Sequence, residues 1–333
     1  MLGGLGGNFF GFLNMVRYLK ENDIKQLLTM PLALELVEQA LKDLALGRAI
    51  DIPRVRTHIP EGVQHVLQAA APELGFIGFK YYYTRPSGKS FYVHLINTKT
   101  AKLEAIIEAV WMSMVRTGAA SGVATRLLAR EDASVVGQIG AGFQAISQLE
   151  AVCAVRKIRT ARVWSRNPDK LQAYCSAMSQ TLGIAVLPAD SAQAAVRGAH
   201  IINVITKAAE PVLKGEWLEP GQHINAAGSN ALSRRELDMA AVGKCDVITV
   251  DARGTARNEC GDLLPAVEKG LLRWDTLTEI GEVIAGRATG RTSPQQITLY
   301  ESHGMGLQDL YVGARMLALA RERGVGVDLP IGD

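Results

Sequence analysis

The stretch GQIGAGFQAISQLEA, residues 137–151, changes from a strand-like to a helix-like pattern within a few residues. Three small residues, Gly140, Gly142 and Ala145, mark the change. In a strand–turn–helix unit that binds a dinucleotide, the first small residue makes the turn, the second lets the backbone approach the diphosphate, and the third lets the helix pack closely on the strand. Free amide groups at the start of such a helix favour an anion. The stretch therefore predicts a dinucleotide site.

Strands and helices alternate along the chain after residue 134. Short apolar runs occupy residues 134–140, 160–165, 200–206, 222–228 and 246–252. Helical crossovers separate them at residues 167–180, 191–196 and 232–242. This alternation is typical of a doubly wound parallel sheet, so the sequence predicts an α/β fold with a Rossmann domain.

The residues before this region follow another pattern. Helical spacing over residues 22–46 predicts a helical pair, and three runs at residues 75–84, 90–96 and 103–109 predict an antiparallel meander. A helix over residues 111–129 leads into the glycine turn. The last helix, residues 302–324, is too distant in sequence to be a sheet crossover, so we expect it to pack back on the N-terminal part. The result is a discontinuous α+β domain, residues 15–127 and 310–333, joined to a dinucleotide-binding domain, residues 128–309.

The composition limits the classes of function. The chain has 333 residues, of which 48% are hydrophobic, which suffices for two domains with substantial cores. Its net charge is only +3 and its basic residues are scattered, which argues against a nucleic-acid surface and favours a small-molecule site. The apolar, glycine-rich residues 1–14 are too short to span a membrane and are expected to be an extra leader before a domain that starts at Met15.

The four cysteines, Cys153, Cys175, Cys245 and Cys260, form no CxxC pair and no metal-type spacing with histidine. We therefore expect reduced thiols in the cytoplasm, with neither a disulfide nor a metal site.

The strand that follows the glycine motif ends at Trp164, Ser165 and Arg166. An NAD site usually places an acidic residue there to bind the ribose 2′-hydroxyl, whereas an arginine accommodates a 2′-phosphate. Neither Trp164 nor Ser165 is acidic, so the sequence favours NADP(H) over NAD(H).

Several stretches together resemble the ornithine cyclodeaminase and μ-crystallin family. They include IPRVRTHIPEG at residues 52–62, RTGAASG at 116–122, GQIGAGFQA at 137–145 and HINAAGSNALSRREL at 223–237. A further match, SPQQITLYESHGMGLQDL, covers residues 293–310. The resemblance extends over nearly all of the chain after Met15. It implies a homodimer in which the discontinuous domain binds substrate and dimerises, without a nucleic-acid or membrane partner.

The resemblance also implies a basic cluster that holds the substrate carboxylate beside the nicotinamide. The matching residues are Lys80, Arg116 and either Arg54 or Arg56. Arginine suits a carboxylate because its guanidinium can bond both oxygens at once, and lysine adds a mobile point charge. The cofactor residues implied by the motif and the family are Thr117, Gly140, Ala141, Gly142, Phe143, Gln144, Ser165, Arg166, Thr206 and Ala227.

The chain departs from the cyclodeaminases at two acidic positions, where it has His65 and Asn230. A neutral amide cannot act as a general base, so cyclisation of ornithine with loss of ammonia is disfavoured. We keep Asn230 among the candidate catalytic residues, and either Lys80 or His65 could relay a proton.

The sequence thus predicts an NADP(H)-dependent oxidoreductase acting on CH–NH and C=N bonds. Its substrate would be an α-imino acid, either a cyclic ketimine such as Δ1-pyrroline-2-carboxylate or the imine of a small 2-keto acid, and its product an L-amino acid. One alternative is an NAD-dependent ornithine cyclodeaminase that forms L-proline and ammonia. Another is a non-catalytic NADPH-binding protein similar to the μ-crystallins.

Overall fold

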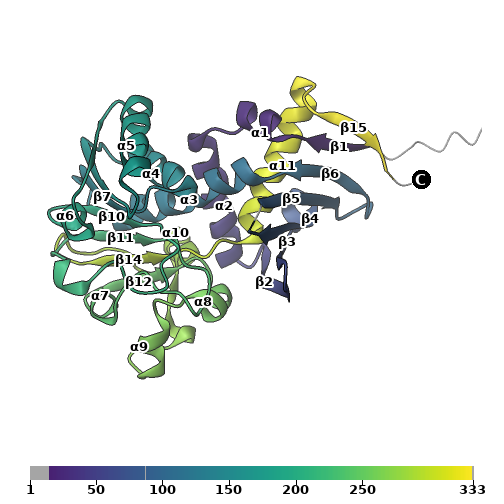
Figure 1. The fold of residues 1–333 in the computed structure, drawn as a ribbon. Coiled ribbons are helices and arrows are strands. Elements are labelled where there is room, and N and C mark those ends of the chain that lie inside the picture. The colour runs from purple at the N-terminus through teal and green to yellow at the C-terminus, as the bar shows by residue number, and fades with distance from the viewer. Residues whose placement is uncertain (1–14, 87, 332–333) are drawn as a thin grey trace, which may run out of the picture.

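A computed structural model describes residues 15–86 and 88–331. The expected leader, residues 1–14, lies outside the described residues. The chain forms two sheets that lie side by side with helices between and around them (Figure 1). Within the described residues, none of the helices combines the length and the apolar character needed to cross a membrane.

The first sheet has seven strands, and its central part is the antiparallel meander predicted from the sequence. Across the sheet the strands are β15 (Val327–Pro330), β1 (Met15–Leu19), β6 (Leu103–Glu108), β5 (Gly88–Asn97), β4 (Phe76–Arg85), β3 (Gly62–Ala71) and β2 (Ile50–Ile59). Strands β1 and β15 come from the two ends of the chain and pair antiparallel. Strands β1, β2, β3 and β15 were not predicted.

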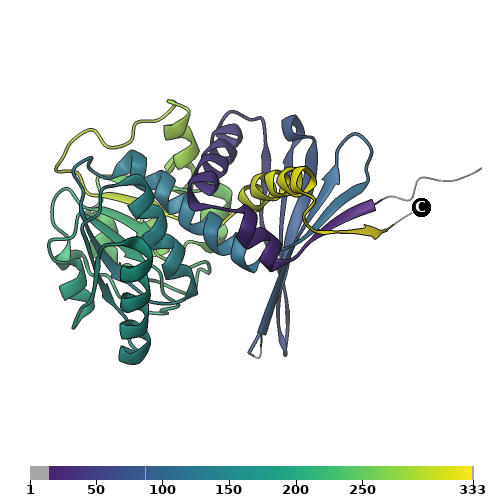
Figure 2. The same cartoon turned by 90° about the horizontal axis from the view of Figure 1, so that it is seen from above.

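Helices cover one face of this sheet (Figure 2). They are α1 (Glu21–Leu27), α2 (Met30–Ala45), α3 (Val110–Leu128) and α11 (Gly306–Arg323). The helical pair and the return of the last helix to this sheet are confirmed. A Cβ on Gly78 of β4 would lie 2.1 Å from the His94 carbonyl oxygen of β5 and 3.0 Å from Leu310 Cδ1 of α11, so glycine permits the close packing of all three elements. No described helix covers the opposite face.

The second sheet has eight strands, all pairing parallel, which confirms the doubly wound α/β fold. The order is β13 (Thr278–Glu279), β12 (Val247–Val250), β14 (Thr298–Glu301), β11 (His223–Ala226), β10 (Ile201–Val204), β7 (Val135–Ile139), β8 (Thr160–Trp164) and β9 (Ala185–Pro188). Its helices are α4 (Phe143–Val155), α5 (Pro168–Leu182), α6 (Ala192–Val196), α7 (Met239–Gly243), α8 (Arg253–Glu259), α9 (Leu264–Glu268) and α10 (Ile280–Ile284).

The order of the strands reverses between β7 and β10. From β7 the chain moves outward to β8 and β9, and it then returns to β10 on the other side of β7. In open parallel sheets, ligands bind beyond the carboxyl ends of the strands at such a reversal. The fold therefore places a binding crevice directly beside the glycine turn that follows β7.

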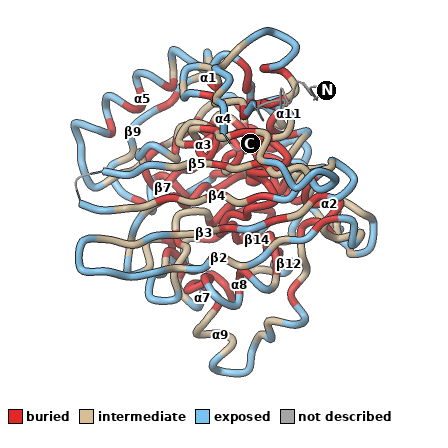
Figure 3. Tube along the Cα trace, turned by 90° about the vertical axis from the view of Figure 1, so that its right-hand side faces the viewer, coloured by how far each residue is buried: buried red, intermediate tan, exposed pale blue. Residues whose placement is uncertain are grey.

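Helices α3 and α4 pack closely and connect the two sheets. At Gly118 of α3 a Cβ would lie 2.2 Å from the Ser147 carbonyl oxygen, so only glycine permits this contact. Buried residues are continuous through this junction (Figure 3). The domain boundaries at residues 127/128 and 309/310 stay a prediction.

Candidate active site

A cavity of about 1040 Å³ opens at the carboxyl ends of β7, β8 and β10. Residues of the seven-stranded sheet and of α3 line one part of it, and loops of the parallel sheet line the rest. The lining residues include all the candidate cofactor residues named above. They also include Arg54, Lys80, Arg116 and Asn230, but not Arg56 or His65. The fold therefore brings most of the sequence candidates to one cavity.

The glycine turn has the geometry that a dinucleotide requires. Gly140 has a φ of 117°, and a Cβ there would lie 2.3 Å from the carbonyl oxygen of Ile205. Gly142 precedes the first turn of α4 without a side-chain cap, and a Cβ there would meet no atom within 4 Å. The amide groups at the start of α4 consequently face open space, where the helix dipole favours a diphosphate. The residues fit a dinucleotide cofactor.

The ribose end of the cavity is basic. Ser165 and Arg166 follow β8, and Lys170 lies in the first turn of α5, where Asn167 accepts a hydrogen bond from its amide. Arg166 and Lys170 are exposed, and neither side chain pairs with a carboxylate among the described residues. Among the described residues that line the cavity, the end of β8 thus offers two cations and no acidic group to a ribose.

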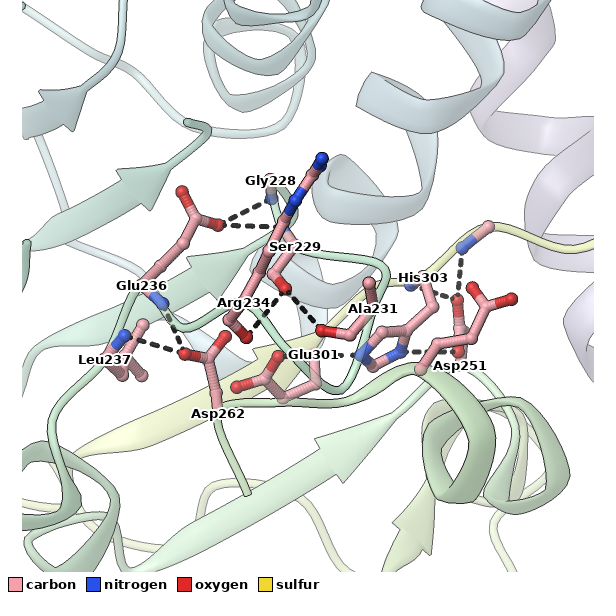
Figure 4. Close-up of polar contacts among 12 residues, drawn as sticks. Gly228, Ser229, Ala231, Arg234, Glu236, Leu237, Asp251, Asp262, Glu301 and His303 are labelled. Carbon is pink, nitrogen blue, oxygen red and sulfur yellow. Dashed lines mark hydrogen bonds and ion pairs between the residues drawn. The ribbon is translucent and has the colours of Figure 1, made fainter. Parts of the chain in front are cut away.

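Glu236 connects two loops at the other end of the cofactor region (Figure 4). Its Oε1 accepts hydrogen bonds from the amide and the hydroxyl of Thr206, each at 2.6 Å. Its Oε2 accepts from the amides of Gly228 and Ser229, at 2.8 and 3.1 Å. Burial raises the pKa of Glu236 to about 7. The sequence analysis did not single out Glu236. Its signal in the sequence is an acidic residue in the SRREL segment, directly before Leu237, which is buried.

Two of the predicted cations share one buried carboxylate. Asp309 Oδ2 lies 2.7 Å from Lys80 Nζ, and its Oδ1 lies 3.1 Å from Arg116 Nε. Lys80 also donates to the Ser113 hydroxyl at 3.3 Å. A Cβ on Gly304, which has a φ of 79°, would lie 2.8 Å from Arg116 Nη1, so glycine at this position leaves room for the guanidinium.

Arg54 and Arg56, from β2, share a second buried carboxylate. Glu259 Oε2 lies 3.2 Å from Arg54 Nη1, and its Oε1 lies 3.1 Å from Arg56 Nη2. Arg54 also donates to the His303 carbonyl at 2.8 Å, and Arg56 donates to the Asn230 carbonyl at 2.7 Å. Of the two arginines, only Arg54 lines the cavity. The sequence left both open, and the choice of Arg54 as the residue that faces the substrate stays a prediction.

Burial perturbs the titration of the two proposed proton carriers. Burial, and then the nearby Arg116 charge, lower the pKa of Lys80 to about 7. Burial, and then Arg54, lower the pKa of His65 to about 3, and its ring stacks on Tyr82 with centroids 4.2 Å apart. Lys80 is therefore able to exchange a proton near neutral pH, whereas His65 stays neutral.

Known proteins similar to this chain share its full architecture. A model of the ornithine cyclodeaminase/mu-crystallin family matches residues 14–322. The uncharacterized cyclodeaminase y4tK of Sinorhizobium fredii is 35% identical over 324 residues, which are 93% of this chain and 98% of the relative. The Thermococcus litoralis Δ1-pyrroline-2-carboxylate reductase, solved with NADH and L-proline, is 33% identical with a TM-score of 0.90, over 94% of this chain and 100% of that one. An archaeal alanine dehydrogenase dimer with bound NAD is 30% identical with a TM-score of 0.90, over 96% and 100%.

Proposed function

The chain belongs to the ornithine cyclodeaminase/mu-crystallin family, and on that premise we propose that it is an NADP(H)-dependent reductase of α-imino acids that forms L-amino acids. At the coarser level it is a nicotinamide-dependent oxidoreductase acting on CH–NH or C=N bonds. The proposed substrates are cyclic ketimines such as Δ1-pyrroline-2-carboxylate and the imines of small 2-keto acids.

One observation carries the proposal. Three buried cations, Arg54, Lys80 and Arg116, line the same cavity as the uncapped start of α4. Among the described lining residues the one carboxylate is Glu210, so the cavity is strongly positive. The positive electrostatic potential favours binding of both an anionic cofactor and an organic acid. A cleft with low-dielectric walls strengthens this potential.

The side chains of the cavity would bind and orient the substrate. Arg116 and Arg54 are held in place by Asp309 and Glu259, so they lose little conformational freedom when a carboxylate binds. Tyr82 and Phe91 supply apolar walls beside Lys80, whose ammonium lies 5.8 and 6.0 Å from their ring centroids. When bound, the reduced nicotinamide supplies the hydride that adds to the imine carbon.

Lys80 is the group that would hold a proton next to the reacting nitrogen. Its pKa of about 7 allows it to donate a proton and to regain one at neutral pH. Asp309 Oδ2, at 2.7 Å, stabilises the protonated form. His65 is unsuited to the role because it stays neutral and does not line the cavity.

The basic ribose end supports NADP(H) as the preferred cofactor. Arg166 and Lys170 can both approach a 2′-phosphate, and a bidentate arginine–phosphate contact is strong and specific. The two solved neighbours described above were crystallised with NADH or NAD. A comparison of both cofactors with this chain tests the proposed preference.

The alternatives have less support. Cyclodeamination of ornithine needs an acidic group where this chain has Asn230, whose backbone carbonyl is bound by Arg56. A purely binding role would leave the buried, paired Lys80 and Arg116 without a purpose. We also propose a cytoplasmic location, because all four cysteines are free.

The open face of the seven-stranded sheet supports a homodimer. Five large aliphatic residues there are each 43–55% exposed: Ile50, Ile52, Val55, Ile59 and Ile77. Beside them, the rings of Tyr81 and Tyr92 and those of Phe79 and His94 form stacked pairs. Contiguous exposed apolar surface of this kind marks a protein interface. A second copy of the chain, packed face to face, is the proposed occupant.

A substrate panel tests the proposed function. NADPH and NADH oxidation would be followed with Δ1-pyrroline-2-carboxylate, its six-membered homologue and pyruvate with ammonia or methylamine. We expect NADPH to be consumed with at least one of these imines. Release of ammonia from ornithine without net change in the cofactor would instead establish a cyclodeaminase. Tight NADPH binding with no turnover across the panel would establish a binding protein.

A further inference from the structure

Three residues that could ligate a metal ion meet behind the wall of the cavity. Cys260 directly follows α8, Glu301 ends β14, and His303 lies two residues further on. One potential ligand atom from each lies within 4.8 Å of the others. All three residues are buried, with exposed fractions of 0%, 1% and 5%.

Several polar atoms in this cluster lack hydrogen-bond partners. Neither ring nitrogen of His303 has a partner at hydrogen-bonding geometry, and Glu301 Oε1 has none either. His303 Nε2 lies 3.9 Å from Glu301 Oε2. A buried polar atom without a partner destabilises the fold, more so if it is charged, so a ligand between these atoms would be stabilising. Both of these side chains supply potential ligand atoms of the cluster.

The cluster also lies in a region rich in buried carboxylates. Four carboxylates, Glu236, Asp251, Asp262 and Glu301, are buried in this region (Figure 4). Among the described residues, no lysine or arginine lies within ion-pair distance of any of them. Arg54 and Arg56 are close, but they pair with Glu259. Buried carboxylates need either protons or a cation, because an isolated charge is very costly in a low dielectric.

The second nitrogen of His303 has the environment of a metal-bound histidine. Its Nδ1 lies 3.5 Å from Asp251 Oδ1, on the side of the ring away from Glu301 (Figure 4). Asp251 Oδ2 in turn accepts the amides of His303 and Gly304, at 2.7 and 2.9 Å. A histidine that binds zinc through one nitrogen usually donates its other N–H to a carboxylate in this way.

We propose that Cys260, Glu301 and His303 bind one divalent transition-metal ion, with zinc as the best match. Thiolate, imidazole and carboxylate are the ligands that zinc prefers, whereas magnesium and calcium require oxygen ligands. Zinc-bound ligand atoms lie about 2.0–2.3 Å from the ion, so the cluster needs to contract by only about an ångström. Three protein ligands leave a fourth tetrahedral position for water.

The bound ion would act as a positioning element for the substrate site. It would tie the loop after β14 to the end of α8, and the His303 carbonyl in that loop accepts the hydrogen bond of Arg54 at 2.8 Å. The neighbouring Glu259 on α8 pairs with Arg54 as well. The spacing of the cysteines predicted no metal site, because a pattern search along the chain does not detect ligands that come from separate elements.

Metal content of the full chain tests the proposal without any assay of activity. The protein would be produced with added zinc, dialysed against metal-free buffer and analysed for bound metal. We expect about one zinc per chain in the natural protein. Cys260→Ala and His303→Leu should reduce it to near zero, and Cys175→Ala, which removes another buried thiol, should leave it unchanged.

Two measurements on folded protein keep the test decisive if a variant is unstable. Replacement by Co²⁺ should give a thiolate-to-cobalt charge-transfer band, which Cys260→Ser should abolish. Zinc should raise the thermal midpoint of the metal-free natural protein. Absence of bound zinc together with an unchanged midpoint would overturn the proposal and show that the carboxylates hold protons. Zinc bound equally well by Cys260→Ala and His303→Leu would overturn it too. NADPH binding, measured separately, reports on the proposed function.

Discussion

Lys80 and Asp309 form a buried ion pair, with 2.7 Å between Nζ and Oδ2, at the wall of the proposed substrate cavity. The pair joins strand β4 to helix α11, so it depends on the return of the C-terminal helix to the N-terminal sheet. The carboxylate opposes the effects of burial and of the Arg116 charge, which lower the Lys80 pKa. The pKa of Lys80 is lowered to about 7, so the charge of its side chain can change near neutral pH.

The affinity for substrate should therefore depend on pH through Lys80. The ammonium is present below its pKa of about 7 and is lost above it, so KM for the imino acid should rise as the pH increases from 6 to 9. Lys80→Arg keeps its charge throughout this range and should remove the dependence, even if kcat falls. Steady-state kinetics of both proteins across the range measure the effect. An equally steep rise of KM in the arginine variant would exclude Lys80 as the titrating group.

The proposed preference for NADPH should depend on Arg166. Replacing Arg166 with aspartate removes a phosphate partner and adds repulsion, so kcat/KM for NADPH should fall about 10- to 100-fold relative to that for NADH. Lys244→Asp makes the same change of net charge at an exposed site outside the cavity and serves as the control. If both variants keep the wild-type ratio, the 2′-phosphate does not bind at the end of β8.

Binding of the cofactor should require the Glu236 connection between the two loops. In Glu236→Gln an NH₂ group replaces one carboxylate oxygen, so it faces either the two Thr206 donors or the amides of Gly228 and Ser229. The NH₂ group and the donors that it faces cannot hydrogen-bond to each other, which should lower the stability of this connection by about 1–3 kcal/mol. Titration calorimetry should show NADPH binding weakened by about tenfold or more. Unchanged affinity in a variant of wild-type stability would mean that the loops are held by other contacts.

The elements with strong local patterns could be predicted from the sequence. The glycine turn, the parallel strands and the amphipathic helices all depend on residues that are neighbours in the chain. Strand β2 was missed because Pro53 and alternating charged residues interrupt its pattern, and β14 lies far in sequence from both of its partner strands. Strands β1 and β15 pair only because the ends of the chain meet.

The residues of the candidate site also fall into those that the sequence could predict and those that it could not. Its cations could be inferred because each belongs to a recognisable motif, whereas Glu259 and Glu236 act through contacts between separate elements. Asp309 lies in the first turn of the last helix, and its partnership with Lys80 depends on tertiary structure. Paired buried charges are formed by the fold, so a single sequence shows the residues but not which ones pair.

The homodimer should depend on the open face of the seven-stranded sheet. Val55 is 53% exposed on β2, and aspartate there would place a charge within the proposed interface. Val55→Asp should therefore convert a dimer into a monomer in sedimentation or light-scattering measurements. Leu187 on β9 is 51% exposed on the other sheet, so Leu187→Asp is a matched control that should stay dimeric. A dimer that resists Val55→Asp would assign the interface to another surface.

The two glycines of the turn should respond differently to the same substitution. Gly140→Ala places a Cβ 2.3 Å from the Ile205 carbonyl oxygen and imposes a φ that alanine rarely adopts, so the free energy of unfolding should fall by about 1–3 kcal/mol. Gly142 has a φ of −90° and open space at its Cβ, so Gly142→Ala should change stability by only about 0.5 kcal/mol. That open space is where the diphosphate would bind, so Gly142→Ala should still weaken NADPH binding markedly. Denaturant unfolding and cofactor titration of both variants separate the two effects. A Gly142→Ala protein that binds NADPH normally would show that the diphosphate does not contact this turn.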